Sequence, residues 1–267
     1  MPHPIEARPL LTGFGRAVGG ALLFATPVLM TMEVWRLGLS LDRYRLAALV
    51  VGTVLLVIGL ARHLGGPVDS GWRGGLADAG VAFLAAAVAA AVILTALGVL
   101  DWLRDWRDAT SVLGLEMLPA AVGASYARAQ LGERSVSPAR SGYGHEVFLM
   151  VAGAVVFAAN LAPTEEIVLL AAWITAWHAL AIVGISLGLM HAFVYEVGFG
   201  GQEDDEGPVR AFATFTVVGY ALAVGVSAYL LWTLGRFDDT GLVMVVTESV
   251  VLALPASLGA AAARLIL

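Results

Sequence analysis

The sequence contains no cysteine and no lysine, and its charged residues are few. The lack of cysteine excludes disulfides and thiolate chemistry. Only 13% of the 267 residues are charged and 59% are hydrophobic, whereas soluble domains have roughly 25% charged and about 45–50% apolar residues. A soluble fold could not bury this much apolar surface. The composition therefore predicts that lipid surrounds most of the chain, and that nucleic acid is not a partner.

Apolar runs long enough to cross a membrane recur along the chain. A helix of about 20 apolar residues spans the hydrocarbon core of a bilayer. The expected spans are 11–37, 46–64, 76–100, 109–129, 147–170, 173–197, 209–234 and 242–267. The predicted fold is an all-α polytopic membrane helix bundle of about eight transmembrane helices.

An even number of spans places both termini on the same side of the membrane. Nine of the fifteen arginines then fall on the side of the termini and six on the other. Because cytoplasmic loops carry an excess of positive charge, this distribution favours cytoplasmic termini. The expected location is the inner (plasma) membrane.

Segments of the two halves of the chain align in the same order at a nearly constant offset. The aligned pairs are 20–33 with 153–166, 94–98 with 231–235, and 119–128 with 255–264. Their offsets are 133, 137 and 136 residues. Similarity at one offset indicates an internal repeat.

The repeat predicts how the chain is organised. Residues 1–131 are expected to form a first four-helix repeat, 132–144 a polar linker and 145–267 a second four-helix repeat. Because each repeat has an even number of helices, both enter the membrane from the same side. We therefore expect parallel repeats related by an axis along the membrane normal.

Four glutamates fall within the expected spans, in the outer half of the membrane. They are Glu33, Glu116, Glu166 and Glu248. An ionisable group inside a membrane is costly and is by default a candidate functional residue. Two repeats packed about an axis could gather the four carboxylates into one site for cation binding or proton exchange. The alternative is that each glutamate lies at an interface, paired with an arginine.

Other polar residues could complete an ion-binding or proton-binding site. Thr31 and Thr164 occupy equivalent positions and can bond a carboxylate or a cation. Asn160 lies one turn before a proline, and His178 could relay a proton beside Glu166.

Prolines and one arginine complete the set of candidates. A proline inside a helix frees a backbone carbonyl, which membrane proteins tolerate where it lines a cavity. Arg16 could reach lipid headgroups or pair with Asp78 at the start of the third span. The candidate prolines are Pro27, Pro119, Pro163 and Pro255.

Two further motifs do not predict an enzyme or a metal site. The thirteen-residue spacing of His178 and His191 does not place both on one metal-binding face. Gly184–Gly188 matches Gly-x-Ser-x-Gly, but a nucleophile elbow needs a strand-to-helix turn and this motif lies within a helix. No catalytic residue and no cofactor are predicted.

Several short motifs resemble those of a known family. They are Gly15–Gly20, Pro27, Thr31–Trp35 and Glu165–Ile167. The chain resembles a bacterial family of integral membrane proteins of unknown function over nearly its whole length. The resemblance implies the eight-helix fold and assigns no catalytic residue.

We predict a membrane transport protein that forms a cation or proton pathway, as a channel or a proton-coupled carrier. The alternative is a non-transporting membrane protein, such as a lipid-binding or assembly module or a lipid-modifying enzyme. The expected partners are the lipid bilayer and a small cation or proton, and self-association into a homo-oligomer is left open.

Overall fold

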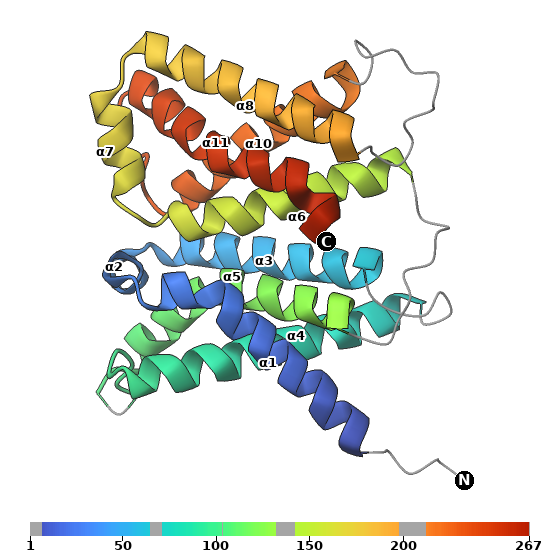
Figure 1. The fold of residues 1–267 in the computed structure, drawn as a ribbon. Coiled ribbons are helices and arrows are strands. Elements are labelled where there is room, and N and C mark those ends of the chain that lie inside the picture. Colours follow the sequence, from blue (N-terminus) through green and yellow to red (C-terminus); the bar gives the residue numbers. More distant parts are fainter. Residues whose placement is uncertain (1–6, 65–70, 103, 132–141, 198–211, 267) are drawn as a thin grey trace. The chain divides into compact units, whose positions relative to one another are not determined.

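The computed structural model describes residues 7–64, 71–102, 104–131, 142–197 and 212–266 (Figure 1). These residues form helices joined by short turns, and no strand occurs among them, so the predicted all-α class is confirmed. Most of the expected linker, 132–144, lies outside the described residues, as does the acidic tract 203–206.

The helices divide into two compact units, which we describe separately. Apart from residues 40–49, the first unit holds α1 (Ala7–Leu29), α2 (Met32–Ser40), α3 (Arg43–Leu64), α4 (Gly71–Ala96) and α5 (Trp106–Leu131). The second holds α6 (Tyr143–Leu161), α7 (Glu166–Trp173), α8 (Ala176–Val197), the π-helix η3 (Phe212–Val217), α10 (Val218–Thr233) and α11 (Leu242–Ile266). Residues 40–49 also belong to the second unit.

Seven helical stretches in the described part of the chain are long and apolar enough to cross a membrane. They lie in α1, α3, α4, α6, α8, η3 with α10, and α11. The eighth expected span, 109–129, corresponds to α5. α5 has 26 residues and would extend about 39 Å, which is long enough to cross a membrane. It is not among the seven stretches, because its hydroxyl-bearing and small residues lower its mean hydropathy.

Two expected spans prove to be broken helices. The run 11–37 divides at residues 30–31 into α1 and the short α2, and the run 147–170 divides at residues 162–165 into α6 and the short α7. Pro27 and Pro163, which the sequence predicts to interrupt a helix just before a glutamate, lie three residues before the first break and within the second. With nine and eight residues, α2 and α7 are too short to cross the hydrocarbon core.

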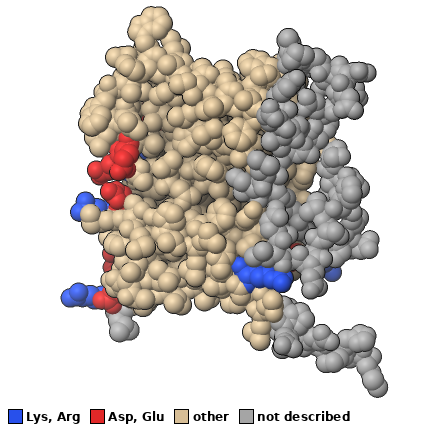
Figure 2. Space-filling view, viewed as in Figure 1, with Lys and Arg blue, Asp and Glu red and all other residues tan. Residues whose placement is uncertain are grey.

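The surface of the described residues suits lipid. On the face shown in Figure 2, charged side chains are few and most of the described surface belongs to other residue types. Many large apolar side chains are exposed, among them Leu23, Leu55 and Val92. A surface this apolar is typical of helices that face the acyl chains of a bilayer.

In the first unit, α1 and α5 cross at two glycines. A Cβ atom added to Gly20 would overlap the carbonyl oxygen of Gly123, and one added to Gly123 would overlap Gly20 and lie 2.6 Å from the Cβ of Phe24. The two backbones therefore touch. Close approach through small residues is how membrane helices gain van der Waals contact, because lipid provides no hydrophobic drive for association.

The second unit contains the same kind of crossing between α6 and α11. A Cβ added to Gly259 would overlap the carbonyl oxygen of Gly153 and lie 2.8 Å from the ring of Phe157. Gly153 and Phe157 align with Gly20 and Phe24 at an offset of 133 residues. Both crossings therefore combine two glycines with a phenylalanine one turn further along.

The turns that follow α4 and α10 also correspond. Gly98 has φ +72° and Gly235 has φ +74°. The amide of the next residue donates to the carbonyl of Leu94 in one turn and of Leu231 in the other, each at 2.9 Å. A glycine in this left-handed conformation ends a helix without a Cβ penalty. The parallel repeats and their boundaries remain a proposal, which these paired features support.

The first residues of α3 are fastened to the second unit by side chains. Arg45 donates two hydrogen bonds of 2.6 Å to the carboxylate of Asp238, in the turn between α10 and α11. The hydroxyl of Tyr229 donates to the carbonyl of Ala48 at 2.7 Å. The bonds from Arg45 hold the pKa of Asp238 below its usual range.

We predict that the glycine crossings limit stability. Gly259→Ala should lower the free energy of unfolding by about 1–3 kcal/mol, because the added methyl group forces the two helices apart. The control is Gly225→Ala, since a Cβ at Gly225 meets nothing within 4 Å. Thermal unfolding in detergent measures both variants. Equal stability of the two variants would contradict the close crossing.

We also predict that Arg45 and Asp238 stabilise the protein as a pair. Arg45→Gln and Asp238→Asn should each lower the melting temperature, and the double variant should be no less stable than either single one. Because the pKa of Asp238 is lowered, the stabilisation is complete above the ordinary aspartate pKa of about 3.9 and is lost as pH falls through the lower folded value. Additive losses in the double variant would argue against the pair.

Candidate functional site

Glu116 is the most deeply buried of the four predicted glutamates. It lies on α5, which packs against α1 and α4, and it is 0% exposed. Neither of its carboxylate oxygens has a hydrogen-bond partner among the described residues. Leu115 and Leu118 beside it are buried as well. A carboxylate is costly in such surroundings unless its charge is neutralised.

The backbone near Glu116 is also incompletely bonded. Pro119 lies inside α5, three residues further along. Because proline has no N–H, the carbonyl of Leu115 lacks its usual helical donor. One turn of α5 therefore contains two groups that receive no hydrogen bond from the helix backbone: the carboxyl group of Glu116 and the carbonyl oxygen of Leu115.

Glu248 is equally buried but has a charged neighbour. It lies on α11, is 1% exposed, and its Oε2 atom has no hydrogen-bond partner among the described residues. Arg236, in the turn after α10, attracts this carboxylate electrostatically. Arg236 also donates through Nη2 to the carbonyl oxygen of Pro163, in the break between α6 and α7. An arginine thus connects the buried acid of α11 with the break between α6 and α7.

Glu33 and Glu166 lie in a different setting. Each occupies the first turn of a short helix, α2 or α7, where the helix dipole favours a carboxylate. Glu33 is half-buried and Glu166 is exposed. A hydrogen bond from the backbone N–H of Glu166 holds the pKa of its carboxyl group below the usual range. These two acids stabilise helix starts, and they do not share the buried position of Glu116.

The predicted hydroxyls bond to nearby backbone. Thr31 donates to the carbonyl of Pro27 at 2.5 Å, and Thr164 to that of Leu161 at 2.8 Å. The carbonyl of Leu161 also accepts from the amide of Thr164 at 3.0 Å. Pro27 lies near the end of α1, whereas Pro255 lies inside α11, in the same setting as Pro119 of α5.

Asn160 and His178 are also engaged locally. The amide nitrogen of Asn160 donates to the carbonyl of Val156 at 2.7 Å, while its Oδ1 atom is buried and has no partner in the described part of the chain. His178 is exposed and its Nδ1 atom lies 2.8 Å from the hydroxyl of Thr175, at the start of α8. No bond joins His178 to Glu166 within the described residues.

Asp78 pairs with Arg128, at 2.6 Å, between α4 and α5. Arg16 is half-buried on α1 and forms no ion pair with Asp78 among the described residues. Both predicted roles of Arg16, contact with lipid headgroups and pairing with Asp78, stay predictions.

The convergence of all four glutamates on one cavity stays a prediction. Within each unit, the two glutamates occupy different environments: one is buried on the last helix and one lies at the start of a short helix. No group of three or more acidic, histidine or cysteine side chains in the described residues could hold a metal ion.

Three polar features were missed from the sequence. They are the buried Glu146 of α6, the Arg236 bridge and the Arg45–Asp238 pair. Glu146 could have been suspected, because His145-Glu146 stands directly before a long apolar run. Arg236 could have been noticed as the residue that follows the paired Gly235. The partners of Arg45 and Arg236 are distant in sequence and carry no local signal.

Comparison with known proteins identifies the family. The family model described as "Putative integral membrane protein (DUF2391)" matches residues 13–267. No curated protein and no solved structure matches the chain. With seven candidate spans in the described residues, the match shows an integral, multi-pass membrane protein in contact with the lipid bilayer. The chain belongs to the DUF2391 family of integral membrane proteins.

Proposed function

We propose that this protein carries protons or small cations across a membrane, and that Glu116 is the residue that binds them. The observation that carries the proposal is the burial of Glu116 with both carboxylate oxygens unbonded by the described residues. Ionisable groups within membrane helices are rare and mark ion or proton pathways.

Stability alone does not account for Glu116. A buried carboxyl group without a partner costs free energy, and an apolar side chain of similar size would remove that cost. A structural acid would be expected to have a donor or an arginine beside it, as Asp78 has Arg128. A group that binds and releases a proton or a cation needs no permanent partner.

Glu248 supports the proposal in a different way. Arg236 supplies a fixed positive charge near this acid, so a transported cation would meet competition there. We therefore expect transport to depend more on Glu116 than on Glu248, despite their similar burial.

The inner membrane and cytoplasmic termini, which the arginine distribution favours, are part of the same proposal.

The test is ion flux in liposomes that contain the purified protein. Glu116→Gln keeps the size and polarity of the side chain but removes its charge, and should reduce proton or cation flux to the level of empty liposomes. Glu165→Gln, at an exposed residue, is the matched control and should retain wild-type flux.

Two results would count against the proposal. Wild-type flux in Glu116→Gln would show that Glu116 is not the binding residue. The absence of flux in the wild-type protein, tested with protons, Na⁺ and K⁺, would instead favour the non-transporting alternative, which is a lipid-binding or assembly module or a lipid-modifying enzyme.

A further inference from the structure

Several arginines lie at the end of the first unit where α3 ends and α4 begins. Arg62 is next to last in the candidate membrane span of α3, and Arg73 is the first residue of the candidate span of α4. Arg128 lies in the last turn of α5. Among the described residues at this end, Asp78 is the one acid. Positive charge therefore predominates here, and Figure 2 shows basic side chains at the surface of this unit.

The side chain of Arg62 lies across α4. A Cβ atom added to Gly75 would be 2.9 Å from the Cγ atom of Arg62 and 3.9 Å from its Cδ atom. Gly75 is buried, whereas Arg62 is exposed. An arginine commonly packs its aliphatic stem on the protein while its charged end reaches water or lipid headgroups. The glycine thus leaves room for the stem of Arg62, and α4 holds this side chain at the edge of the membrane.

Arg128 reaches the same part of α4 from the other side. Its Nη2 atom lies 2.6 Å from the Oδ1 atom of Asp78, and both side chains are half-buried. Asp78 follows Gly75 by three residues, so the two are neighbours on one face of α4. Arg62 and Arg128 therefore lie along a single turn of α4. One carboxylate cannot neutralise the charge of two guanidinium groups.

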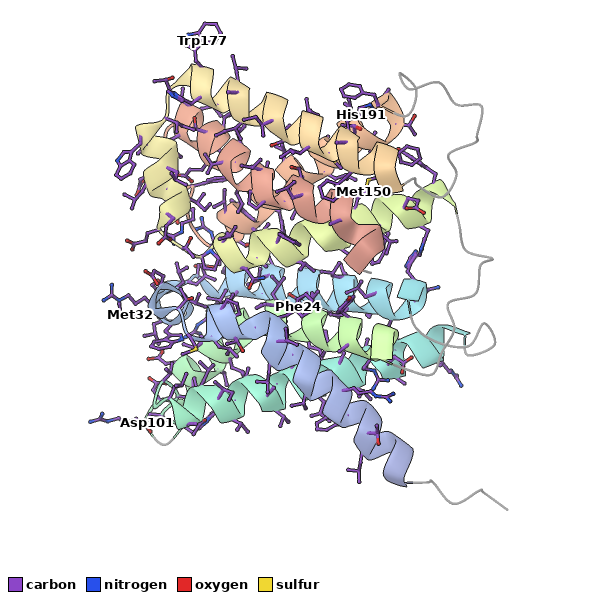
Figure 3. The ribbon with its side chains drawn as sticks, in the orientation of Figure 1. Phe24, Met32, Asp101, Met150, Trp177 and His191 are labelled. Atoms are coloured by element: carbon purple, nitrogen blue, oxygen red, sulfur yellow. The ribbon has the colours of Figure 1, made fainter. Side chains whose placement is uncertain are left out.

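Arg16 joins this group from α1. A Cβ atom added to Gly20 would overlap that of Ala127 on α5, and Phe24, labelled in Figure 3, lies against the preceding turn of α5. The two helices therefore run in opposite directions. Arg16 precedes Gly20 by one turn, and Arg128 directly follows Ala127. Both arginines thus lie beyond the helix crossing on the same side of it.

Apolar surface continues from the exposed arginines into the membrane. On α3, Leu55 is 65% exposed and lies seven residues before Arg62, which is about two turns along the same face. On α4, Leu84 is 57% exposed and lies eleven residues after Arg73, which is about three turns along the same face. Each face therefore combines a cation at the membrane edge with a leucine about 10 or 16 Å deeper. A phospholipid has the same arrangement of charge and apolar chain.

We propose that this end of the first unit binds a lipid with an anionic phosphate headgroup, held by Arg62, Arg128 and Arg16. Guanidinium groups bond phosphate oxygens in pairs, and basic pockets between membrane helices bind anionic headgroups. The apolar faces of α3 and α4 favour a lipid over a free phosphate ion. With the cytoplasmic termini proposed above, the lipid belongs to the cytoplasmic leaflet, whose negative charge attracts basic groups. The inference does not depend on ion transport.

The experiment is native mass spectrometry of the purified protein in detergent, titrated with phosphatidylglycerol or with phosphatidylcholine of the same acyl chains. The wild-type protein should retain phosphatidylglycerol in preference. Arg62→Gln and Arg128→Gln should each weaken its binding about fivefold, which is the typical contribution of one basic residue near a membrane surface. The matched control is Arg104→Gln, at an exposed arginine in the turn between α4 and α5, and it should bind as the wild-type protein does.

A second pair of variants separates lipid binding from a structural role. Arg128→Gln and Asp78→Asn break the same ion pair. Asp78→Asn also removes the negative charge from the site, so it should bind phosphatidylglycerol at least as tightly as the wild-type protein. Arg62→Lys keeps the positive charge and should lose less binding than Arg62→Gln.

Four results would overturn the proposal. They are equal binding of the two lipids by the wild-type protein, unchanged binding in Arg62→Gln and Arg128→Gln, an equal loss in Arg104→Gln, and an equal loss in Asp78→Asn and Arg128→Gln. Inorganic phosphate provides the remaining arm. It should not displace the bound lipid at equal concentration, and displacement would show that the site takes a free phosphate ion and not a lipid.

Discussion

The contact on which each unit depends is the crossing of its first and last helices at paired glycines. Without side chains between them, the backbones of α1 and α5 touch in one unit and those of α6 and α11 in the other. In a bilayer this contact must come from close packing, because surrounding lipid is as apolar as the helices. The crossing also fixes which face of α5 and α11 is buried.

That face carries the two buried glutamates. Glu116 lies seven residues before Gly123, which is about two helical turns, and Glu248 lies eleven before Gly259, which is about three. Each glutamate therefore projects on the same side as the crossing glycine and is drawn into the core. The helix packing that stabilises each unit thus also buries one glutamate, at a cost in free energy. For this reason we interpret the two buried glutamates as functional.

The two units resemble each other in structure and differ in charge. Arg236 follows Gly235, and the residue that follows the equivalent Gly98 is Val99. A single arginine therefore gives Glu248 a cationic neighbour, while the carboxylate oxygens of Glu116 have no hydrogen-bond partner among the described residues. If the units arose by duplication, they now differ at this position, with a valine in one and an arginine in the other.

Much of the fold could be predicted from the sequence, because hydropathy directly reports which segments lie in lipid. Glu116 and Glu248 could be found for the same reason, since a charge within an apolar run is conspicuous. Pro27 and Pro163 indicated the breaks after α1 and α6, but the short helices α2 and α7 could not be separated from the apolar runs that continue through them. The pairing of Arg45 with Asp238 could not be predicted either, because the two residues lie 193 positions apart in the sequence.

The most direct test of the account is whether the carboxyl group of Glu116 exchanges a proton in the membrane. Infrared difference spectra of the protein in lipid nanodiscs, recorded between acidic and alkaline pH, detect the carbonyl stretch of a protonated carboxylic acid. The account predicts a pH-dependent carboxylic acid band that disappears in Glu116→Gln and remains in Glu165→Gln. A spectrum that is the same in Glu116→Gln as in the wild-type protein would contradict it.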